Sequence, residues 1–200
     1  MSDRYTNNDL PPCRVFRRLE LGETLVLGCD PAEVNDFCAL AAFSKKHNDF
    51  PIIYNSIIES TQFGHEIYNI STYIKNKTEI WPRVAVERNT GAGTIYVLKE
   101  RNYPDLFRMV DFSATSTTEG GGIGWVTSGH WSGGELQGTR RKMLDDLALG
   151  LKQGILKLYD EQQIRQFMSF VMVRGRAQAH SNKKDDLVVA SAIAWQVAQL

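Results

Sequence analysis

The chain has 200 residues, of which 42% are hydrophobic; this is enough for one domain with a substantial core and too few for two full domains. Its 23 Lys and Arg residues are balanced by 23 Asp and Glu residues, so no overall positive charge attracts nucleic acid or an anionic membrane. Three cysteines without CxxC spacing and no long apolar run argue against a disulfide framework and a membrane-spanning segment.

Residues 1–20 are polar and show no sustained hydrophobic period, which predicts a flexible lead-in. Residues 21–200 are predicted to form the single domain. An apolar run over 24–29 predicts a buried strand that ends in Asp30 and Pro31. Because proline cannot donate to a sheet ladder, the strand should stop there and leave the Asp30 carboxylate at the rim of the sheet. Asp30 is therefore a candidate for chemistry, with a turn-forming or capping role as the alternative.

Two further strands are predicted over 37–43 and 52–58, where apolar and β-branched residues are separated by short polar turns. Together with the first strand they predict an antiparallel meander. Apolar residues three and four apart over 65–75 predict a helix that covers the sheet.

A short strand over 81–86 ends in Glu87, which repeats the pattern at Asp30 and places a second carboxylate at the rim. The alternative for Glu87 is a surface ion pair with Arg83 or Arg88.

Beyond Glu87 the remaining elements are predicted as a helix over 94–101, a hairpin over 109–127, helices over 135–154 and 160–170, and a polar loop over 174–184. The last helix begins at 184–186, and Asp185 and Asp186 lie in its first turn, where acids complement the helix dipole. These two acids cap the helix or join Asp30 and Glu87.

The four acids Asp30, Glu87, Asp185 and Asp186 converge if the two strands are neighbours and the last helix crosses their ends. Carboxylates so close repel each other unless cations neutralise them. Oxygen ligands without a Cys or His cluster favour Mg²⁺ or Mn²⁺. Two such ions are suited to phosphodiester cleavage, and they would let a chain of zero net charge hold a polyanion.

Basic residues near the predicted site are candidates for contacts with a DNA backbone, although they also fit ordinary solvated faces. They are Arg140, Arg141, Lys142, Lys183 and Lys184.

Five motifs occur in a characteristic order: Leu27-Gly28-Cys29-Asp30-Pro31-Ala32 with Asp36 shortly after, Val84-Ala85-Val86-Glu87-Arg88-Asn89 with Gly91, Gly124-Trp125-Val126-Thr127, Arg140-Arg141-Lys142-Met143-Leu144, and Lys184-Asp185-Asp186-Leu187-Val188-Val189-Ala190. This order resembles the nuclease domain of the large terminase subunit of tailed bacteriophages. The resemblance implies an α/β, ribonuclease H-like fold, in which a mixed sheet is flanked by helices. It also implies that Asp30, Glu87, Asp185 and Asp186 bind two divalent ions and are catalytic.

The resemblance further implies an endonuclease that cuts concatemeric phage DNA with little sequence preference in the cytoplasm of an infected bacterium. Its implied partners are double-stranded DNA, the terminase ATPase domain, the small terminase subunit and the portal protein. Two features depart from the family: Lys184 stands where histidine is common, and Glu33-Val34-Asn35 replaces a glycine-rich turn, so that Glu33 adds a possible ligand. No phosphate-loop motif is present in these residues.

Two alternatives remain open at this point. One keeps the fold but changes the substrate, to a four-way junction or an RNA strand. The other is a non-catalytic docking module of a packaging motor, in which the acids are structural.

Overall fold

The computed structural model describes residues 10–32, 36–109, 122–128, 130–132, 135–173, 176–179 and 184–200. In chain order its elements are β1 (Cys13–Val15), β2 (Leu25–Asp30), β3 (Cys38–Ser44), β4 (Asp49–Ser56), α1 (Ser60–Thr78), β5 (Arg83–Val86), α2 (Ala92–Glu100), β6 (His130–Ser132), β7 (Glu135–Gln137), α3 (Thr139–Lys152), α4 (Glu161–Ser169), β8 (Phe170–Val173), β9 (Arg176–Ala179) and α5 (Asp186–Ala198). None of the described helices is both long and apolar enough to cross a membrane.

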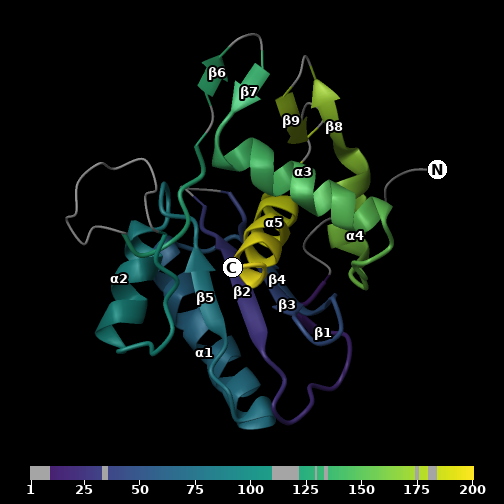
Figure 1. Cartoon of the computed structure of the whole chain (residues 1–200). Coiled ribbons are helices and arrows are strands. Elements are labelled where there is room, and N and C mark those ends of the chain that lie inside the picture. Colours follow the sequence, from purple (N-terminus) through teal and green to yellow (C-terminus); the bar gives the residue numbers. More distant parts are fainter. Residues whose placement is uncertain are drawn as a thin grey trace.

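A mixed five-stranded sheet forms the centre of the molecule, with the strand order β1-β4-β3-β2-β5 (Figure 1). Strands β2, β3 and β4 pair antiparallel, so the predicted meander is confirmed, and β5 joins β2 in parallel. A parallel neighbour needs a crossover, and α1 provides it. The predicted fold class, a mixed sheet flanked by helices, is confirmed.

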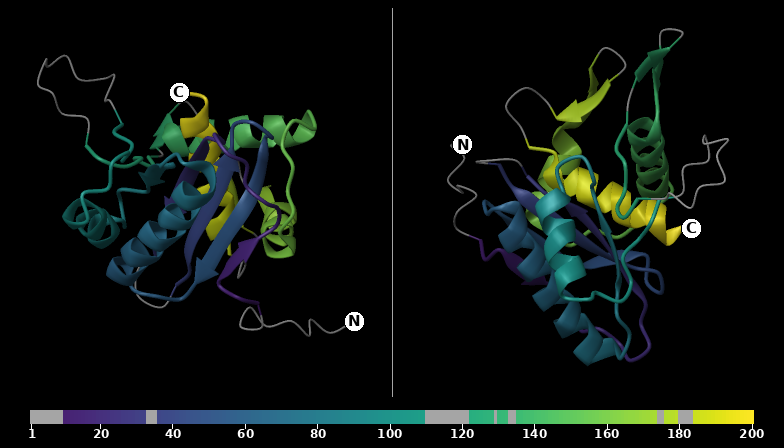
Figure 2. Two further views of the ribbon diagram at one scale, coloured as in Figure 1. Left: turned by 90° about the horizontal axis from the view of Figure 1, so that it is seen from below. Right: turned by 90° about the vertical axis from the view of Figure 1, so that its left-hand side faces the viewer.

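The two faces of the sheet are covered by different helices. Figures 1 and 2 show α1 and α2 on one side and α5, with α3 beyond it, on the other. Side chains alternate along β2, so Leu25, Leu27 and Cys29 pack in the core under α1, whereas Val26 lies in the core under α5. Asp30 follows Val26 in steps of two and therefore lies on the α5 face.

Two segments differ from the predicted elements. The helix predicted over 135–154 begins at Thr139, because Glu135–Gln137 forms β7 and pairs with β6. Within the predicted loop over 174–184, Arg176–Ala179 forms β9 and pairs with β8. The strands of both hairpins have only three or four residues, which is too short for a hydrophobic period to show in the sequence. Most of the hairpin predicted over 109–127 lies outside the described residues.

The segment before β2 is attached to the sheet by Arg17. Its guanidinium donates to both carboxylate oxygens of Asp49, at 2.6 and 2.8 Å, and to those of Glu23, at 2.5 and 3.2 Å. The two acidic side chains are 2% and 0% exposed. Because β1 pairs with β4, the described part of the predicted lead-in contacts the domain. The predicted boundary between the lead-in and the domain at residue 20 stays a prediction.

Replacing Arg17 with methionine is expected to lower the free energy of unfolding by about 3 kcal/mol, because it leaves two buried carboxylates without their partner. Burial alone would raise the pKa of Glu23, but the hydrogen bonds from Arg17 lower it to about 2, below its ordinary value of 4.5. Glu23 therefore stabilises the fold above pH 4.5, and this contribution is lost as the pH falls toward 2. Urea unfolding between pH 3 and 7 measures both effects.

The control is Lys46→Met, which removes an exposed ion pair with Glu20 and should change the free energy of unfolding by less than about 1 kcal/mol. Equal losses of unfolding free energy in the two variants would show that the buried ion pairs of Arg17 stabilise the fold no more than an exposed ion pair does.

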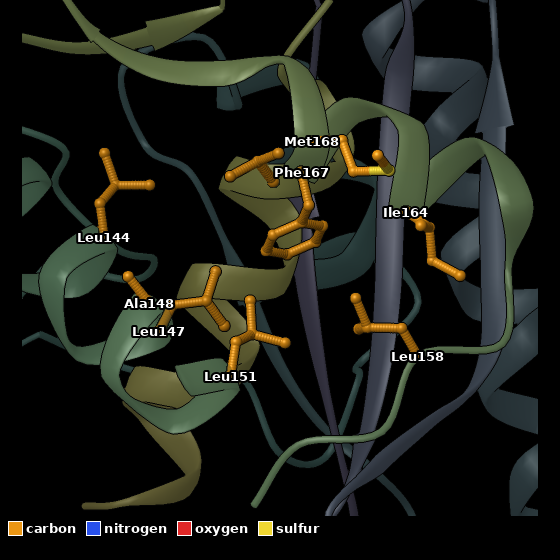
Figure 3. Close-up of a pocket in the computed structure, with 9 residues that line it drawn as sticks. Leu144, Leu147, Ala148, Leu151, Leu158, Ile164, Phe167 and Met168 are labelled. Carbon is orange, nitrogen blue, oxygen red and sulfur yellow. The ribbon is translucent and has the colours of Figure 1, made fainter. Parts of the chain in front are cut away.

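A cavity of about 370 Å³ lies between α3, α4 and the start of α5 (Figure 3). Apolar side chains line it: Leu144, Leu147, Ala148, Leu151, Leu158, Ile164, Phe167, Met168 and Val188. Such a lining has no group that could bind a phosphate or a metal ion, so this cavity is not the candidate site.

Candidate functional site

Asp30 and Glu87 lie beside each other at the ends of neighbouring parallel strands. The ladder between β2 and β5 continues past β5, since the Glu87 N–H donates to the Cys29 carbonyl at 2.8 Å. Burial raises the pKa of Asp30 well above its ordinary value, and the charge of Glu87 and a side-chain hydrogen bond with it raise the pKa further. The structure therefore brings together two acids that are 57 positions apart in the sequence.

The Glu87 side chain is held in the interior by the residues around it. It is 8% exposed, and the Thr90 hydroxyl lies 3.2 Å from its Oε2 and 2.7 Å from the Pro31 carbonyl. A surface pair with Arg83 is not formed, because Arg83 binds Asp105 at 3.0 Å.

Helix α5 carries the other two acids to the same edge by an unusually close approach to β2. A Cβ built on Gly28 would lie 2.0 Å from the Ala190 carbonyl oxygen and 2.5 Å from the Ala194 nitrogen, so only glycine fits there. Asp186 precedes Ala190 by four residues, which places it on the same face of the helix, and Asp30 follows Gly28 by two on the same face of the strand. The charges of Asp186 and Asp185 accordingly raise the pKa of Asp30.

Asp186 is an acid without a full set of partners. Burial, followed by the charges of Asp36 and Asp185, raises its pKa to about 7. Its Oδ2 atom is buried and has no hydrogen-bond partner. An unsatisfied buried carboxylate oxygen is costly in a protein interior, and a bound cation would satisfy it.

Asp36 is a further acid near the site; it follows the first of the five motifs but was not among the predicted ligands. It follows Asp30 by six residues, across the turn from β2 to β3, and its charge acts on Asp186. Lys184 pairs with Asp36 and lies 5.6 Å from the centre of the Phe37 ring. The signal for Asp36 was its position just beyond the turn, since antiparallel neighbours return to the same edge of the sheet.

Asp185 occupies the N-cap position of α5, yet its side chain makes no capping hydrogen bond. Its Oδ2 instead accepts a hydrogen bond from Arg140 Nη2 at 3.0 Å. Simple capping of α5 by this side chain, which was the alternative interpretation, is therefore not what the structure shows. The contact brings Arg140, at the start of α3, to the edge of the acidic cluster.

The other predicted DNA-binding residues on α3 pair within their own helix rather than with the acidic cluster. Arg141 and Lys142 pair along α3 with Asp145 and Asp146, one turn further on, as on an exposed helix face. Lys183 and Glu33 lie outside the described residues. Of the predicted basic set, the structure places Arg140 and Lys184 in contact with acids at the candidate site.

Comparison with known proteins finds similar structures but no similar sequence. No family model and no curated protein match the sequence. The large terminase nuclease from thermophilic phage G20c superposes with a TM-score of 0.64 over 94% of this chain and 90% of that one, at 11% identity. The Thermus phage P74-26 large terminase nuclease domain gives 0.61 over 93% and 85%, also at 11% identity.

This chain has the large terminase nuclease fold. Structures of the G20c nuclease with bound magnesium, cobalt and zinc are also similar, with TM-scores of 0.66, 0.62 and 0.59 and identities of 10 to 11%. The fold that the five motifs predicted is thus present across nearly the whole chain, although little of the sequence is shared.

The donor atoms of the clustered acids Asp30, Glu87, Asp185 and Asp186 are of the type that a hard divalent cation prefers. They are oxygen donors only. The Cys29 and Cys38 thiols, on which the charge of Asp30 acts, pack in the core under α1. As they stand, no three His, Cys, Asp or Glu side chains of the described residues are arranged to hold a metal ion. The donor chemistry and the unsatisfied Asp186 oxygen nevertheless fit such an ion.

Proposed function

We propose that the protein is a metal-dependent endonuclease that cuts double-stranded DNA with little sequence preference. The observation that carries this proposal is the convergence of Asp30, Glu87 and Asp186 at one edge of a terminase nuclease fold. Burial and neighbouring negative charges raise the pKa of Asp30 and of Asp186, and a bound cation that neutralises these charges would be favoured.

In this proposal Asp30 would anchor both ions, and Glu87, Asp186 and Asp185 would supply further ligands. When bound, Mg²⁺ or Mn²⁺ would lower the pKa of the attacking water and stabilise the leaving 3′ oxygen. Arg140 then lies at the rim of the site, where its guanidinium suits a DNA phosphate. Arg141, Lys142, Lys183 and Lys184 are proposed to contact the DNA backbone further out.

The biological role proposed is the cutting of concatemeric phage DNA during packaging in the cytoplasm of the infected host. The similar structures are large terminase nucleases of phages, and this likeness supports the role. The terminase ATPase domain, the small terminase subunit and the portal protein are the proposed partners.

Incubation with supercoiled plasmid tests the proposal. With Mg²⁺ or Mn²⁺ the protein should nick and then linearise the plasmid, and excess EDTA should abolish cutting because the ions would activate the attacking water. Gel electrophoresis over time measures both products. Cutting that is unchanged in EDTA would contradict the proposed chemistry.

A panel of substrates separates the alternatives. Preference for a linear duplex over a four-way junction and an RNA–DNA hybrid supports the proposed substrate, whereas preference for either of the others indicates a junction-resolving or RNA-cleaving enzyme. A docking module would cut none of them and would show no Mn²⁺ binding by calorimetry.

A further inference from the structure

The first turn of α5 is capped by another helix. The Leu187 N–H, in the second position of α5, donates to Gln166 Oε1 of α4 at 2.9 Å. Leu187 is 0% exposed and Gln166 is 7% exposed, so water does not replace this bond. The side chain of Asp185, which stands at the N-cap, points to Arg140 instead.

We propose that Gln166 is a positioning residue of the metal site, an inference that rests on the proposed function. A buried N–H at a helix N-terminus must be paired, and an aspartate at the N-cap ordinarily accepts from the second or third N–H. Because Gln166 already fills this role, the Asp185 carboxylate stays with Arg140 and the acidic cluster. Without Gln166, Asp185 would turn toward its own helix and away from Arg140.

Helix α4 is fixed in place by contacts that precede Gln166. Asp160 accepts a hydrogen bond from the Gln163 N–H at 2.7 Å and forms an ion pair with Arg14 at 2.5 Å. One turn before Gln166, the Gln163 side chain donates to Ser191 Oγ at 2.8 Å. Gln163 therefore joins the same two helices as Gln166 but contacts α5 further from the acids.

This pair of glutamines gives a matched test. We expect Gln166→Met to weaken Mn²⁺ binding about 10- to 100-fold, the usual effect of losing a group that orients a metal ligand. Gln163→Met removes a buried hydrogen bond between the same helices and should leave the Mn²⁺ dissociation constant unchanged. Gln166→Glu keeps an acceptor oxygen at the same reach and should restore binding. Calorimetric titration with Mn²⁺ and urea unfolding of each metal-free variant measure affinity and stability separately.

Each outcome decides the matter. Weaker Mn²⁺ binding in Gln166→Met but not in Gln163→Met, at similar loss of stability, supports the positioning role. Equal weakening in both variants, or none in either, overturns it while leaving the proposed nuclease intact. If the unaltered protein binds no Mn²⁺, the proposed function fails and the role of Gln166 with it. Should Gln166→Met not fold, Gln166→Asn, whose shorter amide withdraws the acceptor, takes its place with the same criteria.

Discussion

Replacing Asp30 with asparagine is expected to abolish metal-dependent DNA cleavage and to raise the stability of the metal-free protein. Activity should fall about a thousandfold or more, because the proposed anchor of both ions loses its charge. Burial and the charges of Glu87 and Asp186 raise the pKa of this carboxyl, so its ionised form destabilises the fold. This penalty grows as the pH rises above 3.8, the ordinary pKa of the group, and asparagine removes it.

Two measurements check the Asp30 prediction. Plasmid cleavage with Mn²⁺ gives the loss of activity, and urea unfolding in EDTA at pH 7 should show a gain of about 1 kcal/mol. The control is Asp105→Asn, which removes an exposed carboxylate paired with Arg83 and should leave cleavage unaltered. If both variants cut plasmid equally well, Asp30 does not anchor the site and the nuclease proposal loses its foundation.

Replacing Gly28 with alanine is expected to disrupt the packing of α5 on β2. The added methyl carbon would lie 2.0 Å from the Ala190 carbonyl oxygen and 2.5 Å from the Ala194 nitrogen. Both of these neighbours are backbone atoms, so no side-chain rotation can relieve the overlap. We expect a loss of about 3 kcal/mol or more in the free energy of unfolding. Since β2 carries Asp30 and α5 carries Asp186, separating the two elements also separates the acids and should lower Mn²⁺ affinity.

The matched control for Gly28 is Gly93→Ala in the first turn of α2. There the new methyl carbon would lie 3.2 Å from the Ser60 hydroxyl, which small shifts accommodate, and alanine favours the helix. Thermal and urea unfolding should therefore show little change. A Gly28→Ala protein with an unchanged unfolding midpoint would show that α5 and β2 are not in the close contact described above.

The local sequence pattern was sufficient to predict the central strands. β2, β3 and β4 each carry apolar runs with sharp polar ends, and the physical cause of each strand lies within its own few residues. Asp30 and Glu87 were found for the same reason, since each ends an apolar strand. Hairpins β6-β7 and β8-β9 were not predicted, because strands of three or four residues are too short to show a hydrophobic period.

The sequence by itself determined the antiparallel meander, the helix that begins at Asp186, and the acids that end β2 and follow β5. The mixed sheet was implied by the resemblance to terminase nucleases. Only the tertiary structure decided that these acids share one edge, that Asp36 acts on Asp186, and that Gln166 caps α5. Each of those contacts joins residues from different elements, so it depends on how closely the backbones pack. At Gly28 the close packing is possible because glycine has no side chain, and hydrophobic periodicity does not reveal this cause.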